Sequence, residues 1–161
     1  MPLTVRDATH ADVPRLVEIA RRAFLSAFGF TAPFALLQQW MVEDKEPDWY
    51  ERDWRAMQVC ERQGEIAGLV QPIVDEINGL WVHPDHQGQG VGSTLLAEGE
   101  ARILQAGFER SWLVCSGYNR RALRFYEARG YAIVTELRTS HPGDIEELSF
   151  RMERTLIARP A

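Results

Sequence analysis

A glycine-rich segment at residues 87–93 is the part of this sequence best suited to binding a ligand. It follows an apolar run that ends at Val82 and a short turn, and it precedes an apolar stretch of helical character. Glycines let backbone N–H groups approach a phosphate closely, and a helix N-terminus adds partial positive charge behind it. We therefore expect a pyrophosphate to bind here. The candidate contacts are Gln87, Gly88, Gln89, Gly90, Val91, Gly92 and Ser93.

The spacing of these glycines excludes two common phosphate loops. A Walker A loop needs a lysine beside its last glycine, and this segment contains none. A dinucleotide fingerprint needs a third glycine at the position of Ser93, and it opens its domain instead of lying in the middle of the chain. A glycine-rich turn that binds no ligand is the remaining alternative.

A second motif follows the first along the chain. Residues 111–117 read as a short buried strand, and residues 119–129 read as a helix with apolar positions at helical spacing. Asn119 and Tyr126 lie two turns apart on this helix, so their side chains point to the same side. Taken singly, Asn119 could serve only as a helix cap and Tyr126 only as a core residue.

Together the two motifs resemble those of the GNAT superfamily of N-acetyltransferases. The first follows the pattern Gln-x-x-Gly-x-Gly from Gln87 to Gly92, as in the acyl-CoA loop of that superfamily. The second signature of the superfamily is matched by Asn119, Ala122, Phe125, Tyr126, Gly130 and Tyr131. The resemblance implies that acetyl-CoA is the co-substrate and that an amine accepts the acetyl group.

The resemblance also implies roles for individual residues. Leu80 and Trp81 are expected to flank the pantetheine arm, and a backbone N–H near Val82 is expected to polarise the thioester carbonyl. Tyr126 resembles the general acid of the superfamily, whose hydroxyl positions and stabilises the leaving thiolate. Asn119 is expected to bond the pantetheine arm or to order the start of its helix.

The group that removes the proton of the amine is less well defined. An alkyl ammonium has a pKa of about 10.4 and must lose a proton before it can attack. Glu76 stands where histone-acetylating members carry a glutamate, so it is the candidate base. A water relay is the alternative, and Glu76 would then be a solvated charge at a strand start. Neither Cys60 nor Cys115 stands beside a base in the sequence, which favours direct transfer in a ternary complex over an acyl-cysteine.

The acceptor is expected to be a small amine or an amino-acid-like metabolite. Members that acetylate ribosomal-protein N-termini often carry Glu-Val-Arg where residues 114–116 read Val-Cys-Ser, which disfavours a protein N-terminus. A protein or peptide acceptor, a non-catalytic acyl-CoA-binding module and a nucleotide-dependent oxidoreductase are the alternatives. Four aromatic residues could contact a substrate, although at least two are expected to pack in the core. They are Trp40, Trp49, Tyr50 and Trp54.

The elements predicted around these motifs form one α/β domain over residues 1–161. Strands are predicted at 3–6, 57–61, 65–73, 76–82, 112–116, 131–138 and 147–152. Helices are predicted at 12–24, 92–105 and 119–129, with irregular helix over 32–56 that breaks near Pro47. This order matches the acyl-CoA N-acyltransferase fold, a mixed, splayed and mostly antiparallel sheet flanked by helices. Asn78-Gly79 is a suitable place for a bulge that helps the sheet to splay.

Composition narrows the partners and the location. The net charge of −5 disfavours nucleic acid, and no apolar run is long enough to span a membrane. The histidines and cysteines do not have metal-binding spacing, so no metal is expected, although His83 and His86 share one turn. The N-terminus lacks a signal-peptide core and the two cysteines read as reduced, so a cytoplasmic location is expected. Because dimers are common in the superfamily, a second copy of the chain is a candidate partner.

Overall fold

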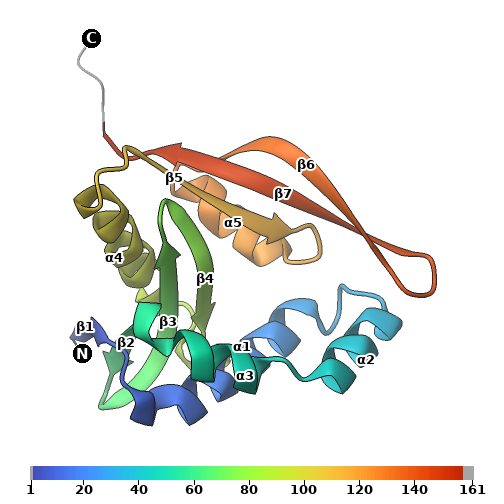
Figure 1. The fold of residues 1–161 in the computed structure, drawn as a ribbon, viewed down its shortest axis with the longest axis horizontal. Coiled ribbons are helices and arrows are strands. Elements are labelled where there is room, and N and C mark those ends of the chain that lie inside the picture. Colours follow the sequence, from blue (N-terminus) through green and yellow to red (C-terminus); the bar gives the residue numbers. More distant parts are fainter. Residues whose placement is uncertain (1, 158–161) are drawn as a thin grey trace.

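The fold is a single mixed sheet with helices on both faces, seen in a computed structural model that describes residues 2–157 (Figure 1). The strands are β1 (Leu3–Asp7), β2 (Gln58–Arg62), β3 (Glu65–Ile73), β4 (Glu76–Val82), β5 (Arg110–Ser116), β6 (Ala132–His141) and β7 (Ile145–Thr155). The α-helices are α1 (Val13–Phe28), α2 (Phe34–Glu43), α3 (Glu46–Asp53), α4 (Val91–Gln105) and α5 (Arg120–Ala128). Short 3-10 turns are η1 (His10–Asp12), η2 (Trp54–Ala56) and η3 (Pro84–His86).

The sheet is splayed between β4 and β5. Its strand order is β1-β2-β3-β4-β5-β7-β6, and every neighbouring pair is antiparallel except β4 with β5. These two parallel strands are paired at one position, Glu76 with Trp112, and they diverge beyond it. The predicted fold class is therefore confirmed.

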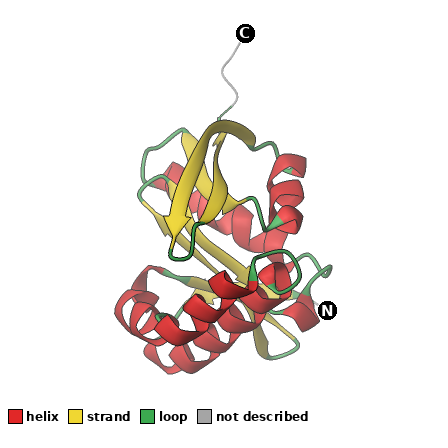
Figure 2. Cartoon of the chain, turned by 90° about the vertical axis from the view of Figure 1, so that its right-hand side faces the viewer, coloured by secondary structure: helices red, strands yellow, loops and turns green. Residues whose placement is uncertain are grey.

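Figure 2 shows helices flanking the strands, and two hydrophobic clusters join these helices to the two faces of the sheet. The cluster on one face joins α4 and α5 to the sheet and contains Leu95, Ile103 and Tyr126. The cluster on the other face joins α1 and α3 to the sheet and contains Leu16, Ile19 and Tyr50. Helices cover both faces of the sheet at β3 and β4, so the open edge of β4 lies between two packed layers.

A bulge interrupts β4 at the predicted place. Gln71 of β3 lies opposite Gly79, and the next residue, Pro72, lies opposite Ile77, so Asn78 has no partner in the register. Side chains of a regular strand alternate between faces, yet Ile77 and Leu80 belong to the same cluster. The extra residue therefore reverses the alternation, and Glu76 faces the α1 side while Leu80 faces the α4 side.

Three details differ from the sequence-based predictions. The helical region 32–56 breaks at Asp44, whose φ of 41° ends α2, and Pro47 instead lies in the first turn of α3. The helix predicted to begin at Asp12 begins at Val13, and the Asp12 carboxylate bonds to Arg6 and to the Thr9 N–H without capping it. The final hairpin of β6 and β7 is longer than predicted and extends beyond the other strands (Figure 1).

Candidate active site

A cavity of about 540 Å³ lies at the open edge of β4. It is lined by the end of β4, the glycine-rich segment, the first residues of α4, the length of α5 and the C-terminal part of α1. We call it the cofactor cavity. The predicted site residues that line it are Leu80, Trp81, Val82, Gln87, Gly88, Gly90, Gly92, Ser93, Asn119 and Tyr126. Two predicted contacts are not part of its wall, since Val91 is buried in the core and Gln89 faces solvent.

The glycine-rich segment forms a backbone-lined wall of the cofactor cavity. Gly88 and Gly90 have φ values of 73° and 83°, in the left-handed region that favours glycine. Gly90 is the N-cap residue of α4, so the first N–H groups of this helix have no intrahelical acceptor. A Cβ on Gly92 would lie 3.2 Å from the Phe125 ring, so glycine lets α5 approach α4 closely. These features make the segment an anion-binding wall.

The side chain of Gln87 connects two elements that the splayed sheet separates. Its Nε2 donates to the carbonyl of Val82 at 3.2 Å, and its Oε1 accepts a hydrogen bond from Arg121 of α5. Both ends of the amide are therefore used within the protein. Gln87 holds the end of β4 against α5, in addition to the cofactor contact that the motif predicts.

Three arginines that the sequence motifs did not single out line the cofactor cavity. They are Arg120, Arg121 and Arg129. Arg129 donates to Ser93 Oγ at 3.1 Å and to the carbonyl of Phe125 at 2.9 Å, and its guanidinium lies 3.7 Å from the centre of the Phe125 ring. A cluster of arginines in an acidic chain, beside a predicted phosphate loop, was the signal that could have identified them.

Asn119 and Tyr126 lie on the wall formed by α5. Asn119 Oδ1 accepts a hydrogen bond from the Ala122 N–H at 3.2 Å, so this side chain caps the helix. Tyr126 is only 8% exposed and packs edge-on against Phe125 and Tyr131. Burial, with the nearby Cys115 thiol, raises the pKa of Tyr126 well above its ordinary value. Its hydroxyl therefore keeps its proton throughout the physiological pH range.

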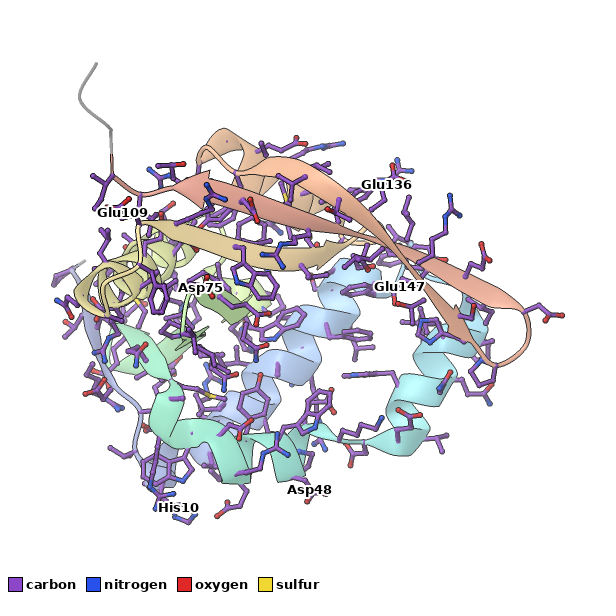
Figure 3. The ribbon with its side chains drawn as sticks, turned by 45° about the horizontal axis from the view of Figure 1, so that its top comes forward. His10, Asp48, Asp75, Glu109, Glu136 and Glu147 are labelled. Carbon is purple, nitrogen blue, oxygen red and sulfur yellow. The ribbon has the colours of Figure 1, made fainter. Side chains whose placement is uncertain are left out.

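Glu76 lies apart from the cofactor cavity, at the point where β4 still pairs with β5. Asp75 beside it accepts a hydrogen bond from Trp112 Nε1 at 2.9 Å (Figure 3). Burial and the Asp75 charge raise the pKa of Glu76, and Arg151 opposes this shift. The bulge at Asn78 turns Glu76 toward the face of the sheet that carries α1.

A second cavity, of about 610 Å³, adjoins the first. Thr31, Tyr118 and Arg120 line both cavities, and the β6–β7 hairpin contributes Glu146 and Leu148 to the second alone. A chain of side chains braces this hairpin, because Glu147 accepts hydrogen bonds from Ser116 and pairs with His141 (Figure 3). We call this space the second cavity.

The four aromatic residues before β2 have mainly packing roles. Tyr50 is buried in the α1-side cluster, and Trp54 packs against the same cluster. Trp40 stacks on Phe24 with ring centres 4.0 Å apart, and Trp49 is half exposed. All four lie within the described residues, and none lines the cofactor cavity or the second cavity.

The comparison with known families agrees with this geometry. The model of the acetyltransferase (GNAT) family matches residues 14–131. The chain belongs to this family. The family match spans α1 from its second residue, the glycine-rich segment and all of α5, so it includes both walls of the cofactor cavity.

Individual relatives give further detail. The chain is 32% identical over 98 residues to the mycothiol acetyltransferase of Sanguibacter keddieii, covering 53% of this chain and 31% of that protein. It is 36% identical over 80 residues to the aminoalkylphosphonate N-acetyltransferase of Salmonella typhimurium, covering 44% of this chain and 52% of that protein. The matched segments thus span about a third and about half of these relatives.

A solved structure extends the likeness to the whole fold. The PaiA N-acetyltransferase of Thermoplasma acidophilum, in complex with coenzyme A, superposes with a TM-score of 0.76 at 18% identity, covering 96% of this chain and 99% of that one. Over residues 2–157 of our chain, no helix has the length and apolarity needed to cross a membrane. In the same residues, no set of three or more His, Cys, Asp or Glu side chains is arranged to hold a metal ion.

Proposed function

We propose that the chain is an N-acetyltransferase that moves the acetyl group of acetyl-CoA to the primary amine of a small molecule or amino-acid-like metabolite. The acceptor is acetylated by direct transfer in a ternary complex. The observation that carries this proposal is the cofactor cavity, which brings the glycine-rich segment, the open edge of β4 and Tyr126 to one space. Membership of the acetyltransferase (GNAT) family supports it.

The residues of the cofactor cavity suit acetyl-CoA, which supplies an activated acetyl thioester when it is bound. A Cβ placed on Gly88 would meet no atom within 4 Å, so the backbone at this point is open to a ligand. The N–H groups of residues 88–93 would hold the pyrophosphate. The unpaired edge of β4, from Leu80 to Val82, would pair with the amide groups of the pantetheine arm.

Three groups of the chain would share the chemistry of transfer. A backbone N–H near Val82 would stabilise negative charge on the thioester oxygen as the C–N bond forms. Glu76 lines neither cavity, so it would take the proton of the amine through intervening water, and a water relay without Glu76 is the alternative. Tyr126 would donate a hydrogen bond to the sulfur as the C–S bond breaks. The raised pKa of Tyr126 makes complete proton loss unfavourable, so its main role would be to stabilise the thiolate.

The second cavity is the proposed acceptor site. It adjoins the cofactor cavity on the side away from the glycine-rich segment, and Arg120 lines both spaces. A guanidinium at this boundary suits an amine that also carries a carboxylate or a phosphonate. The name of one relative, aminoalkylphosphonate N-acetyltransferase, supports an acceptor of this kind.

A panel of acceptors tests the proposal directly. The release of free thiol from acetyl-CoA would be measured with amino acids, aminoalkylphosphonates, simple alkylamines and a peptide with a free N-terminus. Turnover with the small acidic amines is the expected result. Preference for the peptide would assign a protein acceptor, and acetyl-CoA binding without any turnover would assign a non-catalytic module. A protein that binds no acetyl-CoA would refute the proposed function altogether.

A further inference from the structure

Positive charge is concentrated on one wall of the cofactor cavity although the chain as a whole is acidic. The net charge is −5, yet three guanidinium groups line this cavity, from Arg120, Arg121 and Arg129. Arg120 lies at the boundary with the second cavity. Arg121 and Arg129 instead contact the glycine-rich segment at its two ends, through Gln87 and Ser93. These two arginines therefore bracket the segment.

Arg129 is held rigidly at the start of α4. Three hydrogen bonds fix its guanidinium, two to Ser93 Oγ and one to the Phe125 carbonyl, and the Phe125 ring covers one face of it. A guanidinium has five N–H donors, so these contacts leave donors for a ligand. Because the group is already ordered, little side-chain entropy would be lost when it binds an anion.

Arg121 is exposed and has a weaker tie to the protein. Its guanidinium donates to the neutral amide oxygen of Gln87. A phosphate oxygen is a stronger acceptor than an amide oxygen, since charge-assisted hydrogen bonds are roughly twice as strong as neutral ones. Arg121 can therefore exchange its amide partner for a phosphate, or bind both with different N–H groups.

The two arginines exceed what a pyrophosphate requires. The backbone N–H groups of the glycine-rich segment and of the first turn of α4 would supply hydrogen-bond donors for that group. Coenzyme A carries one further phosphate, a monoester at the 3′ position of its ribose, which has a second pKa near 6 and is mostly dianionic at pH 7. Bidentate guanidinium contacts suit such a group.

We propose that Arg121 and Arg129 bind the 3′-phosphate of coenzyme A, and that the protein thereby selects coenzyme A over dephospho-coenzyme A. This inference rests on the proposed function, because it concerns the same cofactor. It assigns two residues outside the family motif to recognition of a group that takes no part in acetyl transfer.

Calorimetric titration with coenzyme A and with dephospho-coenzyme A tests the proposal without any need for turnover. The wild-type protein is expected to bind coenzyme A at least about tenfold more tightly, which corresponds to about 1.4 kcal/mol. In Arg121→Gln and Arg129→Gln, this preference is expected to shrink while affinity for dephospho-coenzyme A changes little. Arg124→Gln is the matched control, because Arg124 is exposed on the same helix and does not line the cavity.

The outcomes separate this inference from the proposed function. Equal affinity of the wild-type protein for the two ligands would overturn the inference and leave the acetyltransferase proposal intact. An equal loss of affinity for both ligands in the arginine variants would assign them to the pyrophosphate and also overturn it. No binding of either ligand would overturn both proposals. Because Arg129 also contacts Ser93 and Phe125, the thermal unfolding of Arg129→Gln is compared with that of the wild-type protein. If Arg129→Gln does not fold, the binding preference of Arg121→Gln decides, because that variant loses a single exposed hydrogen bond.

Discussion

Tyr126 lines the cofactor cavity from within a cluster of aromatic rings. Burial makes the charged form of Tyr126 unfavourable, so its phenol stays protonated near neutral pH and can donate a hydrogen bond. A donor aimed at a developing thiolate acts mainly on the transition state, where negative charge on sulfur is greatest. Its removal should therefore lower kcat and leave binding nearly unchanged.

Tyr126→Phe is expected to lower kcat by about 100-fold, in the range for loss of a positioned proton donor, with little change in KM for acetyl-CoA. Steady-state kinetics with the best acceptor measure this effect. Tyr131→Phe is the matched control, because it removes the same atom from a neighbouring buried ring that bonds Ser111 Oγ at 2.9 Å. The control should lose about 1 kcal/mol of stability and retain its turnover. Full activity in Tyr126→Phe would refute the assigned role.

Glu76 is expected to set the acidic limb of the pH–rate profile. A base must be deprotonated, so kcat/KM should fall as the pH drops toward the raised pKa of Glu76. Asp75→Asn removes a like charge, lowers that pKa and should move the limb to lower pH while Trp112 keeps its acceptor. Glu76→Gln should abolish this limb and lower kcat/KM by about 100-fold. If Glu76→Gln kept both the acidic limb of the pH–rate profile and the wild-type kcat/KM, another group, or a water relay, would be the base.

At the scale of elements, close contact between α4 and the sheet depends on glycine. A Cβ on Gly68 of β3 would lie 2.8 Å from the Trp81 carbonyl oxygen and 2.8 Å from Leu95 of α4. The carbonyl belongs to the backbone of β4, so it cannot move without displacing the strand that borders the cofactor cavity. Stability and cofactor binding are therefore linked at this position.

Gly68→Ala is expected to lower the free energy of unfolding by about 2 kcal/mol, as overpacking of a core does, and to weaken acetyl-CoA binding as well. Urea unfolding and calorimetric titration measure the two effects. Gly79→Ala serves as control, because a Cβ there would lie 3.8 Å from Gln71, an ordinary contact distance. Similar losses in both variants would show that the close approach of α4 is not the cause.

The sequence allowed the elements that carry motifs to be predicted better than the elements between them. The strong spacing signals of α4 and α5 are local, so both helices were predicted to within a few residues. The break at Asp44 depends on a left-handed backbone at a residue other than glycine, which no local pattern indicates. The cavity position of Arg129 was likewise not predicted. Helical periodicity gives the direction of a side chain around its own helix, but it does not show that α4 lies close enough for Ser93 to accept a hydrogen bond from Arg129.

At the scale of the whole molecule, two parts of one sheet diverge from a single paired position. Strands β1 to β4 form one part and β5 to β7 the other, and the family's cofactor would lie in the opening between them. A ligand that fills this opening would connect the two parts by hydrogen bonds that the free protein lacks. It should therefore reduce local opening along the free edge of β4.

Hydrogen exchange is expected to report this connection. With acetyl-CoA at about 100 times its Kd, the global free energy of unfolding should rise by about 2.7 kcal/mol, and amides in residues 79–82 should gain the most protection. Amides shared between β2 and β3 serve as an internal control and should change only with global stability. Uniform protection throughout the sheet would contradict binding in the opening.

The unpaired Asn78 has a consequence for any change in the length of β4. Deletion of Asn78 would restore a regular ladder with β3, and it would rotate either Glu76 or the Leu80–Val82 segment to the opposite face of the sheet. The proposed base and the proposed thioester-binding edge would then no longer serve a common reaction, although every residue named in the motifs would still be present. The spacing of eleven between Glu76 and Gln87 is thus a functional quantity in its own right.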